Sequence, residues 1–334
     1  MTMLTRTAAI PGRTLSALGL GCMGMSDFYG ATDRGRSVAT VRHALDHGIT
    51  ILDTGDLYGM GHNELLLREA LRDRRREDVF IAVKFGPQRD PAGRFVGIDC
   101  GPAAVKNSLA HTLTRLGTDY VDLYQPARLD PAVPIEETVG AIAEMRQAGH
   151  VGHIGLSEVS ADTLRRAHAE HAISWLQIEY SLLSRGIERE ILPVCRELGV
   201  AVSAYGVLSR GLLSGRWSAS TTLDSGDLRS RLPRFQQGRL EHNLRLVDGV
   251  RRVAEDKGVS VAQLALAWVL SRGEDIIPLV GTRSPERLAE SLDAAEISLS
   301  ERDLARLDAE VPSDAVVGER YDAEQMTLLD SERS

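Results

Sequence analysis

The chain has 334 residues, with 39 Lys and Arg against 47 Asp and Glu, so its formal charge is −8. This acidic balance argues against a nucleic-acid partner and an anionic-membrane partner, because both need clustered positive charge. Three widely spaced cysteines exclude a disulfide framework. The sequence contains neither an apolar leader nor a run of about 18 apolar residues. We therefore expect a cytoplasmic protein.

Short apolar segments alternate with longer amphipathic segments along the chain. Several of the short segments are continuously apolar, which is typical of parallel strands buried on both faces. The expected strands are Leu15–Gly21, Ile49–Asp53, Val79–Lys84, Val121–Tyr124, Val151–Ser157, Trp175–Glu179, Val200–Tyr205 and Ile276–Val280. The expected helices are Ser37–His47, Asn63–Leu71, Pro102–Leu116, Ile135–Gln147, Ala161–Ala169, Glu188–Leu198, Val261–Ser271 and one that begins at Ser284-Pro285.

Eight strands alternating with helices predict an α/β fold, a closed (β/α)₈ TIM barrel that occupies residues 1–334 as a single domain. Residues Leu4–Ile10 and Thr14–Ala17, joined by the turn PGR, predict a β-hairpin ahead of the barrel. The irregular stretch Ser209–Leu240 predicts a long loop after the seventh strand, and loops of this length are usually functional.

Two local patterns suggest chemistry that we reject. Gly19–Gly24 spells GxGxxG, but no helix opens inside it, as a dinucleotide fingerprint requires. His43 and His47 have metal-ligand spacing on a helix without a third ligand nearby, so we expect an ordinary helix face. No metal site is expected.

Charged residues stand where the second and third strands end, at the edge where a barrel forms its active site. Asp53 follows ITIL and Lys84 follows FIAV, and burial favours pairing the two charges. Tyr58 lies close enough in sequence to fold over the pair. A neighbouring ammonium lowers the pKa of a phenol, and such a tyrosine donates a proton to a carbonyl oxygen. The alternative is a structural ion pair with a packing tyrosine.

Other strand ends predict a cofactor site. Ser157, Gln177 and Tyr205 suit a flat, amide-bearing ring, with Tyr205 stacking and the other two side chains bonding the amide. After the eighth strand, a helix start with Arg283 and Arg287 predicts phosphate binding. The alternative there is a capped helix with solvated arginines.

A mostly apolar pocket is expected around this polar centre, and it suits a carbonyl compound of moderate size. Its expected lining residues are Met23, Met25, Phe28, Phe85, Ala127 and Trp217.

Taken together, the motifs resemble the aldo-keto reductase superfamily over essentially the whole chain. The matching segments are DTGDLYG, VKFG, GHIGLSE, QIEYSL, AYGVLSRGLLSG, IPLVGTRSPERLAES and GERYDAEQM. The resemblance implies a (β/α)₈ barrel that binds NADP(H), with Tyr58 as proton donor tuned by Asp53 and Lys84. It also implies a set of cofactor-binding residues: Ser157, Gln177, Tyr205, Gly206, Leu208, Arg210, Gly211, Gly281, Arg283, Arg287, Glu290 and Ser291.

The chain departs from the family pattern after the fourth strand. Members usually carry a histidine in a segment like DLYYQHRVDP, and Ala127 occupies that position here. Either water, another side chain or a polar group of the substrate replaces the histidine, or turnover is slow. Strand alternation predicts that Arg128 points to the other side. Two milder departures are Ser291 and Glu158, each at a position where asparagine is common.

Two functions follow from these features. The first is NADPH-dependent reduction of an aldehyde or ketone, a small-molecule substrate, by direct hydride transfer. The second, motivated by Ala127, is an NADP(H)-binding regulatory or redox-sensing module with weak or no turnover. We expect neither a nucleic-acid nor a membrane partner, and the sequence leaves the oligomeric state and the substrate open.

Overall fold

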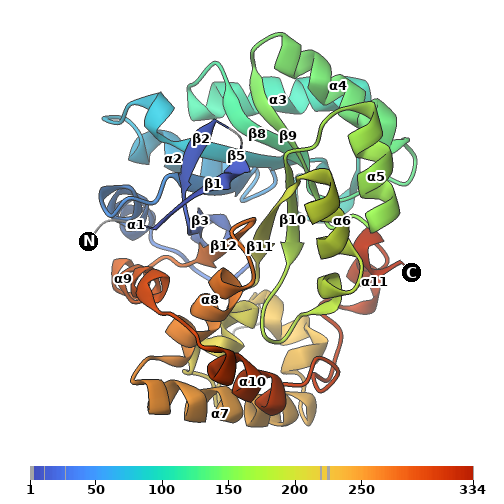
Figure 1. The fold of residues 1–334 in the computed structure, drawn as a ribbon. Helices are drawn as coiled ribbons and strands as arrows, with labels where there is room; N and C mark the ends of the chain where they lie inside the picture. Colours follow the sequence, from blue (N-terminus) through green and yellow to red (C-terminus); the bar gives the residue numbers. More distant parts are fainter. Residues whose placement is uncertain (1–3, 11, 27, 219, 224–225, 334) are drawn as a thin grey trace.

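A computed structural model describes residues 4–10, 12–26, 28–218, 220–223 and 226–333 of the chain. Eight parallel strands form a closed barrel at its centre (Figure 1). In chain order they are β3 (Gly19–Gly21), β4 (Ile51–Gly55), β5 (Phe80–Phe85), β8 (Val121–Pro126), β9 (Val151–Ser157), β10 (Trp175–Glu179), β11 (Ala201–Tyr205) and β12 (Ile276–Gly281). The predicted TIM barrel is confirmed.

A helix follows each barrel strand and packs outside it, as expected when both faces of a parallel sheet are buried (Figure 1). These helices are α1 (Arg34–Asp46), α2 (His62–Ala70), α3 (Pro102–Leu116), α4 (Ile135–Gln147), α5 (Ala161–Glu170), α6 (Ile191–Leu198), α8 (Val261–Ser271) and α9 (Pro285–Leu292). As predicted, Ser284 caps α9 by accepting a hydrogen bond from the backbone of Arg287.

An antiparallel hairpin of β1 (Thr5–Ile10) and β2 (Arg13–Ser16) precedes the barrel, as predicted. Pro11 of the predicted turn lies outside the described residues. Ile10 and Leu15 of the hairpin pack with Ile51, Phe80 and Trp175. Each of these three is the first residue of its barrel strand. The hairpin therefore plugs the amino end of the barrel, and the carboxyl ends of the strands form the open mouth.

One predicted strand is wrong in extent, because Leu15–Gly21 is divided between the hairpin and the barrel. β2 ends at Ser16 and β3 begins at Gly19. The Ser16 hydroxyl donates to the Leu18 carbonyl at 2.6 Å, which turns the chain from one sheet into the other.

Three helices and one hairpin were not predicted: α7 (Arg239–Lys257), α10 (Glu301–Glu310), α11 (Ala323–Met326) and the hairpin of β6 (Pro87–Arg89) and β7 (Phe95–Ile98). α7 and α10 pack together at the lower edge of Figure 1. Leu240, Val247 and Val250 face the core from α7, so the long loop after β11 ends at Gly238. Among the described residues, no helix is long and apolar enough to cross a bilayer.

Candidate active site

Asp53, Lys84 and Tyr58 meet at the mouth of the barrel. Lys84 Nζ donates to Asp53 Oδ1 at 2.5 Å, and both side chains are almost wholly buried. The strand register places Lys84 opposite Gly55, whose lack of a side chain leaves room for the lysine to reach Asp53. The turn after β4 returns Tyr58 over the pair, and Lys84 Nζ lies 5.2 Å from the centre of its ring.

The prediction that the ammonium lowers the pKa of Tyr58 is wrong for this structure. Burial raises the pKa of Tyr58 well above its ordinary value, and the negative charge of Asp53 adds to the effect. Burial also lowers the pKa of Lys84, which Asp53 opposes. Because burial disfavours the phenolate, Tyr58 is a neutral phenol at ordinary pH, which is the form that donates a proton.

Gln177 reaches the same carboxylate from the opposite wall. Its side-chain nitrogen donates to Asp53 Oδ1 at 2.7 Å. The strand order places β10 four strands from β4 in a barrel of eight, so the bond crosses the mouth. Ser157 ends β9 beside it and is buried. The role of both residues in holding an amide-bearing ring stays a prediction.

A second cluster of charges lies at the β9, β10 and β11 side of the mouth. Glu158 accepts from Arg320 at 2.7 Å, and Glu179 accepts from Arg210 at 3.1 Å and from Arg320 at 3.3 Å. Burial opposes the charge on Glu158, but Arg320, Arg128 and the Ser331 hydroxyl together outweigh it and hold the pKa of Glu158 well below its usual range. The C-terminal segment therefore completes this wall of the barrel.

Tyr205 belongs to this cluster through its hydroxyl group. The hydroxyl donates to Glu158 at 2.7 Å and lies 2.9 Å from the Tyr321 hydroxyl. Tyr205 is only partly exposed at the end of β11. Its ring is thus held in one place, as a stacking platform requires, while the stacking itself stays a prediction.

Strand alternation predicts that Arg128 points away from the mouth, and this prediction is wrong. Its guanidinium lies 3.4 Å from the Tyr321 hydroxyl and donates to the carbonyl of Ala127 at 2.6 Å. The strand β8 ends at Pro126, so the alternation of side chains does not extend to residue 128. Ala127 is 5% exposed and contributes only a methyl group.

The first residues of the loop after β11 have backbone shapes that favour glycine. Gly206, Arg210 and Gly211 all have positive φ angles. A Cβ on Gly206 would stand 3.0 Å from the side chain of Glu179, and one on Gly211 would stand 3.1 Å from Trp217. Leu208 lies between them, half-buried against the core. The chain thus turns sharply where the phosphate passage is predicted.

The loop also reaches α9, which follows the neighbouring strand β12. Arg216 pairs with Glu290 of α9 at 3.0 Å, and Trp217 packs edge-on against Phe235. Glu290, predicted to hold the cofactor, is thereby engaged by the loop.

The turn between β12 and α9 gathers positive charge. Arg283 donates to the backbone carbonyls of Tyr29 and Ala31 at 3.0 and 2.8 Å, so it also fixes the β3–α1 loop. Burial lowers the pKa of Arg287, and the nearby charges of Arg216, Arg283 and Arg36 lower it further. Such mutual repulsion is relieved by an anion. Gly281 is exposed at the start of the turn, and buried Ser291 donates to the carbonyl of Arg287.

Two of the six predicted pocket residues do not fit that role. Met25 and Phe85 are wholly buried in the main hydrophobic core, where Phe85 stacks on Tyr124 at 4.3 Å, so neither lines an open pocket. Phe28 packs edge-on against Tyr58 at 6.4 Å. Met23 is partly exposed. The substrate contacts of these residues and of Trp217 stay predictions.

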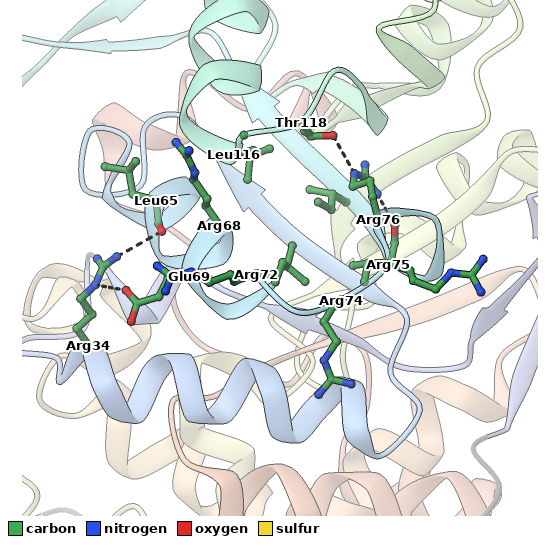
Figure 2. A pocket seen from close by; sticks show the side chains of 14 residues that line it. Arg34, Leu65, Arg68, Glu69, Arg72, Arg74, Arg75, Arg76, Leu116 and Thr118 are labelled. Carbon is green, nitrogen blue, oxygen red and sulfur yellow. Dashed lines mark hydrogen bonds and ion pairs between the residues drawn. The ribbon is translucent and has the colours of Figure 1, made fainter.

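A cavity of about 660 Å³ lies away from the mouth, beside α2 and the start of β5 (Figure 2). Six arginines line it: Arg34, Arg68, Arg72, Arg74, Arg75 and Arg76. Figure 2 shows Arg34 directed at Glu69 and Leu65, and Arg76 directed at Thr118. Arg74 and Arg75 pair with Asp46 and Glu77. These guanidinium groups are directed at separate partners, so the cavity does not gather side chains around one point as the barrel mouth does.

Comparison with known proteins agrees with this geometry. The aldo/keto reductase family model matches residues 17–311. "Probable aldo-keto reductase 1" from Glycine max is 40% identical over 313 residues, which cover 93% of this chain and 89% of that protein. The chain belongs to the aldo/keto reductase family and is an oxidoreductase.

Solved structures give the same result. A glycerol dehydrogenase from Gluconobacter oxydans has a TM-score of 0.85 at 30% identity, covering 93% of this chain and 96% of that one. An aldo-keto reductase from Klebsiella pneumoniae, solved in complex with NADPH, has a TM-score of 0.74 at 28% identity, covering 96% of this chain and 99% of that one.

Sequence reasoning missed the contributions of Arg320, Tyr321 and Arg128 to the mouth. One signal was available, because Glu158 and Glu179 stand on or beside buried strands and a buried carboxylate needs a cation. The sequence did not say which of its many arginines would supply the positive charge.

Proposed function

We propose that the protein reduces an aldehyde or ketone to an alcohol by direct hydride transfer from NADPH, with Tyr58 as the proton donor. The observation that carries the proposal is the buried group at the mouth, in which Lys84 bonds Asp53 and its ammonium lies 5.2 Å from the Tyr58 ring. A structural ion pair alone does not require a buried tyrosine at its open end.

The residues at the adenosine side fit NADP(H). Arg283, Arg287 and Arg216 place several positive charges around the start of α9, where free backbone N–H groups also favour phosphate. In the proposal, Arg287 and Arg283 bind the 2′-phosphate end, with Glu290 and Ser291 beside them. Gly281 opens the turn, and Gly206, Leu208, Arg210 and Gly211 line the pyrophosphate passage.

Ser157, Gln177 and Tyr205 hold the nicotinamide at the mouth in this proposal. When bound, the reduced nicotinamide supplies the hydride. The aldo-keto reductase from Klebsiella pneumoniae, which was solved in complex with NADPH, supports this cofactor.

The chain's own residues carry out the proton transfer. As the carbonyl oxygen gains negative charge, Tyr58 passes its phenolic proton to that oxygen and is reprotonated from solvent. Lys84 stabilises the phenolate that forms, and Asp53 keeps the lysine in place and charged. The raised pKa of Tyr58 keeps the phenol protonated until the substrate oxygen becomes the stronger base.

The proposal is tested by following the absorbance of NADPH with purified protein and a carbonyl panel of small aldehydes, quinones, dicarbonyls and pyridoxal. We expect NADPH oxidation with at least one of these compounds and formation of the matching alcohol. Tight NADPH binding with no turnover on the whole panel would contradict the proposal.

That contrary result would favour the second candidate, an NADP(H)-binding regulatory or redox-sensing module. Its supporting observation is Ala127, whose methyl side chain provides no hydrogen-bond donor where the family pattern has a histidine. We favour the enzyme because Asp53, Lys84 and Tyr58 are assembled in contact, which cofactor binding alone does not need.

A further inference from the structure

Arg128 lies at the mouth of the barrel, next to Ala127. It follows Ala127 directly after β8. Its guanidinium lies 3.4 Å from the Tyr321 hydroxyl and 5.7 Å from the centre of that ring, and one of its nitrogens donates to the Ala127 carbonyl. The side chain is therefore held by a phenol and a backbone carbonyl, while the carboxylate of Glu158 acts on its charge from beyond hydrogen-bond distance.

The other arginines around the mouth are neutralised by carboxylates. Arg210 pairs with Glu179, Arg320 with Glu158, and Arg229 with Asp227. Arg128 has no such ion pair within the part of the chain that the structure describes. A partly buried guanidinium that no carboxylate contacts directly is well suited to bind an anion, because its planar fork matches two carboxylate oxygens.

The charge of Arg128 acts on the reacting centre. It opposes the burial that raises the pKa of Tyr58, and it adds to the burial that lowers the pKa of Lys84. Its positive charge also helps to bring the pKa of Tyr321 below its ordinary value, although burial acts in the opposite sense. Arg128 is therefore within electrostatic range of the proposed proton donor.

The position of Arg128 separates it from the phosphate end of the cofactor site. β8 lies four strands from β12 in the closed barrel of eight, so Arg128 and Arg283 follow strands on opposite walls. A single guanidinium with one phenol beside it matches a monoanion, whereas the β12–α9 turn gathers several arginines.

We propose that Arg128 binds a carboxylate group of the carbonyl substrate, so that the preferred substrate is an aldehyde or ketone that carries a carboxylate. This inference rests on the proposed reductase function. The carboxylate bonds the guanidinium fork, and the carbonyl group then lies at Tyr58. The substrate supplies the polar contact that Ala127 does not.

The kinetic test compares 3- and 4-carboxybenzaldehyde with benzaldehyde, using the full chain with NADPH. We expect the wild type to favour the better carboxylated isomer by about tenfold or more in kcat/KM, as a charge-assisted bidentate contact implies. Arg128→Gln lowers kcat/KM for the carboxylated aldehyde, mainly through KM, by more than it lowers kcat/KM for benzaldehyde, so that most of the preference is lost, while Arg128→Lys retains part of it. The control is Arg72→Gln, an exposed side chain in the cavity beside α2, away from the mouth. We expect this variant to behave as wild type.

Two kinetic outcomes overturn the inference. One is a wild type with no preference for the carboxylated aldehydes. The other is an equal loss of kcat on all three aldehydes in Arg128→Gln, which would mean that Arg128 acts on the reacting carbonyl itself. Thermal unfolding of each variant checks that the fold is intact, and Arg128→Lys serves if Arg128→Gln does not fold.

A binding measurement separates this inference from the proposed reaction. Calorimetry follows the binding of 4-(hydroxymethyl)benzoate and benzyl alcohol to the NADPH-loaded protein, a combination that cannot turn over. Tighter binding of the carboxylated alcohol that depends on Arg128 supports the carboxylate site even if no aldehyde is reduced. Equal binding of the two alcohols overturns it even if benzaldehyde is reduced.

Discussion

Gln177 donates a hydrogen bond to Asp53 across the mouth of the barrel, with 2.7 Å between Nε2 and Oδ1. The same carboxylate oxygen accepts from Lys84. A residue predicted to touch the cofactor is thus bonded to the residue that holds Lys84, the lysine of the proposed proton-transfer group. In the proposed reaction, cofactor position and proton transfer are therefore coupled through this one carboxylate.

Replacing Gln177 tests this coupling. Gln177→Leu removes a hydrogen bond to a buried carboxylate, a contact worth about 1.5–3 kcal/mol. A loss of this size in the transition state corresponds to a fall of about tenfold or more in kcat at saturating NADPH. We also expect NADPH to bind more weakly. Gln88→Leu, at an exposed position of β6, is the control. A raised KM for NADPH with wild-type kcat would show that Gln177 acts on the cofactor alone.

Replacing Arg287 tests the phosphate end. Arg287→Gln removes one charge from a turn in which Arg216, Arg283 and Arg36 repel it. We expect the Kd for NADPH to rise by about tenfold, as loss of a charge-assisted phosphate contact implies, and the Kd for NADH to change little. Fluorescence titration measures both. Equal weakening of the two cofactors would place Arg287 away from the 2′-phosphate, and Arg302→Gln on α10 is the exposed control.

Replacing Arg320 tests the buried charge cluster. Arg320→Ala leaves Glu158, which is wholly buried, without its principal cation. Breaking a buried pair from one side costs about 3–5 kcal/mol, so we expect a loss of that size in the free energy of unfolding. Urea unfolding followed by circular dichroism measures it. The double variant Glu158→Leu/Arg320→Leu is expected to recover part of the loss, and an unchanged midpoint in Arg320→Ala would refute the role of the cluster.

Asp56 predicts a pH-dependent stability. Burial, reinforced by the negative charge of Glu64, raises the pKa of Asp56 from 3.8 to about 7. Between these two values the folded state holds a proton that the unfolded state has released, so Asp56 makes stability fall as pH rises through this window. Above about pH 7 the folded state carries a buried carboxylate whose Oδ1 has no partner among the described residues.

The variant Asp56→Asn removes this effect. We expect its Tm to approach that of the wild type near pH 4 and to exceed it by a growing margin up to about pH 8, because only the wild type charges the buried group. Differential scanning fluorimetry across this range measures the difference, with Asp314→Asn as an exposed control. A constant difference across the range would refute the titration of Asp56.

The barrel and the Asp53–Lys84 pair were predictable because their determinants are local. Asp53 and Lys84 each follow an apolar strand, and neighbouring parallel strands bring such positions to one edge. The boundary at Ser16 was not predictable, because a side-chain bond to Leu18 divides an unbroken apolar run. The sequence pattern carries no information on that bond.

The other side chains at the mouth depend on contacts between residues that are far apart in the sequence. Glu158 takes a cation 162 positions away in the sequence, and many arginines were available. The pKa of Tyr58 was predicted in the wrong direction because burial, which a sequence does not report, outweighs the neighbouring charges. Arg128 was misplaced because its strand ends two residues earlier.

The most direct test of the account replaces Tyr58 by phenylalanine. Tyr58→Phe keeps the ring and removes the phenolic proton, so we predict a loss of about 100-fold or more in kcat/KM for the best aldehyde. The Kd for NADPH, measured by fluorescence titration, is expected to stay close to wild type because the proposed cofactor contacts lie on other residues. Reduction at the wild-type rate by Tyr58→Phe would contradict the central claim that Tyr58 is the proton donor.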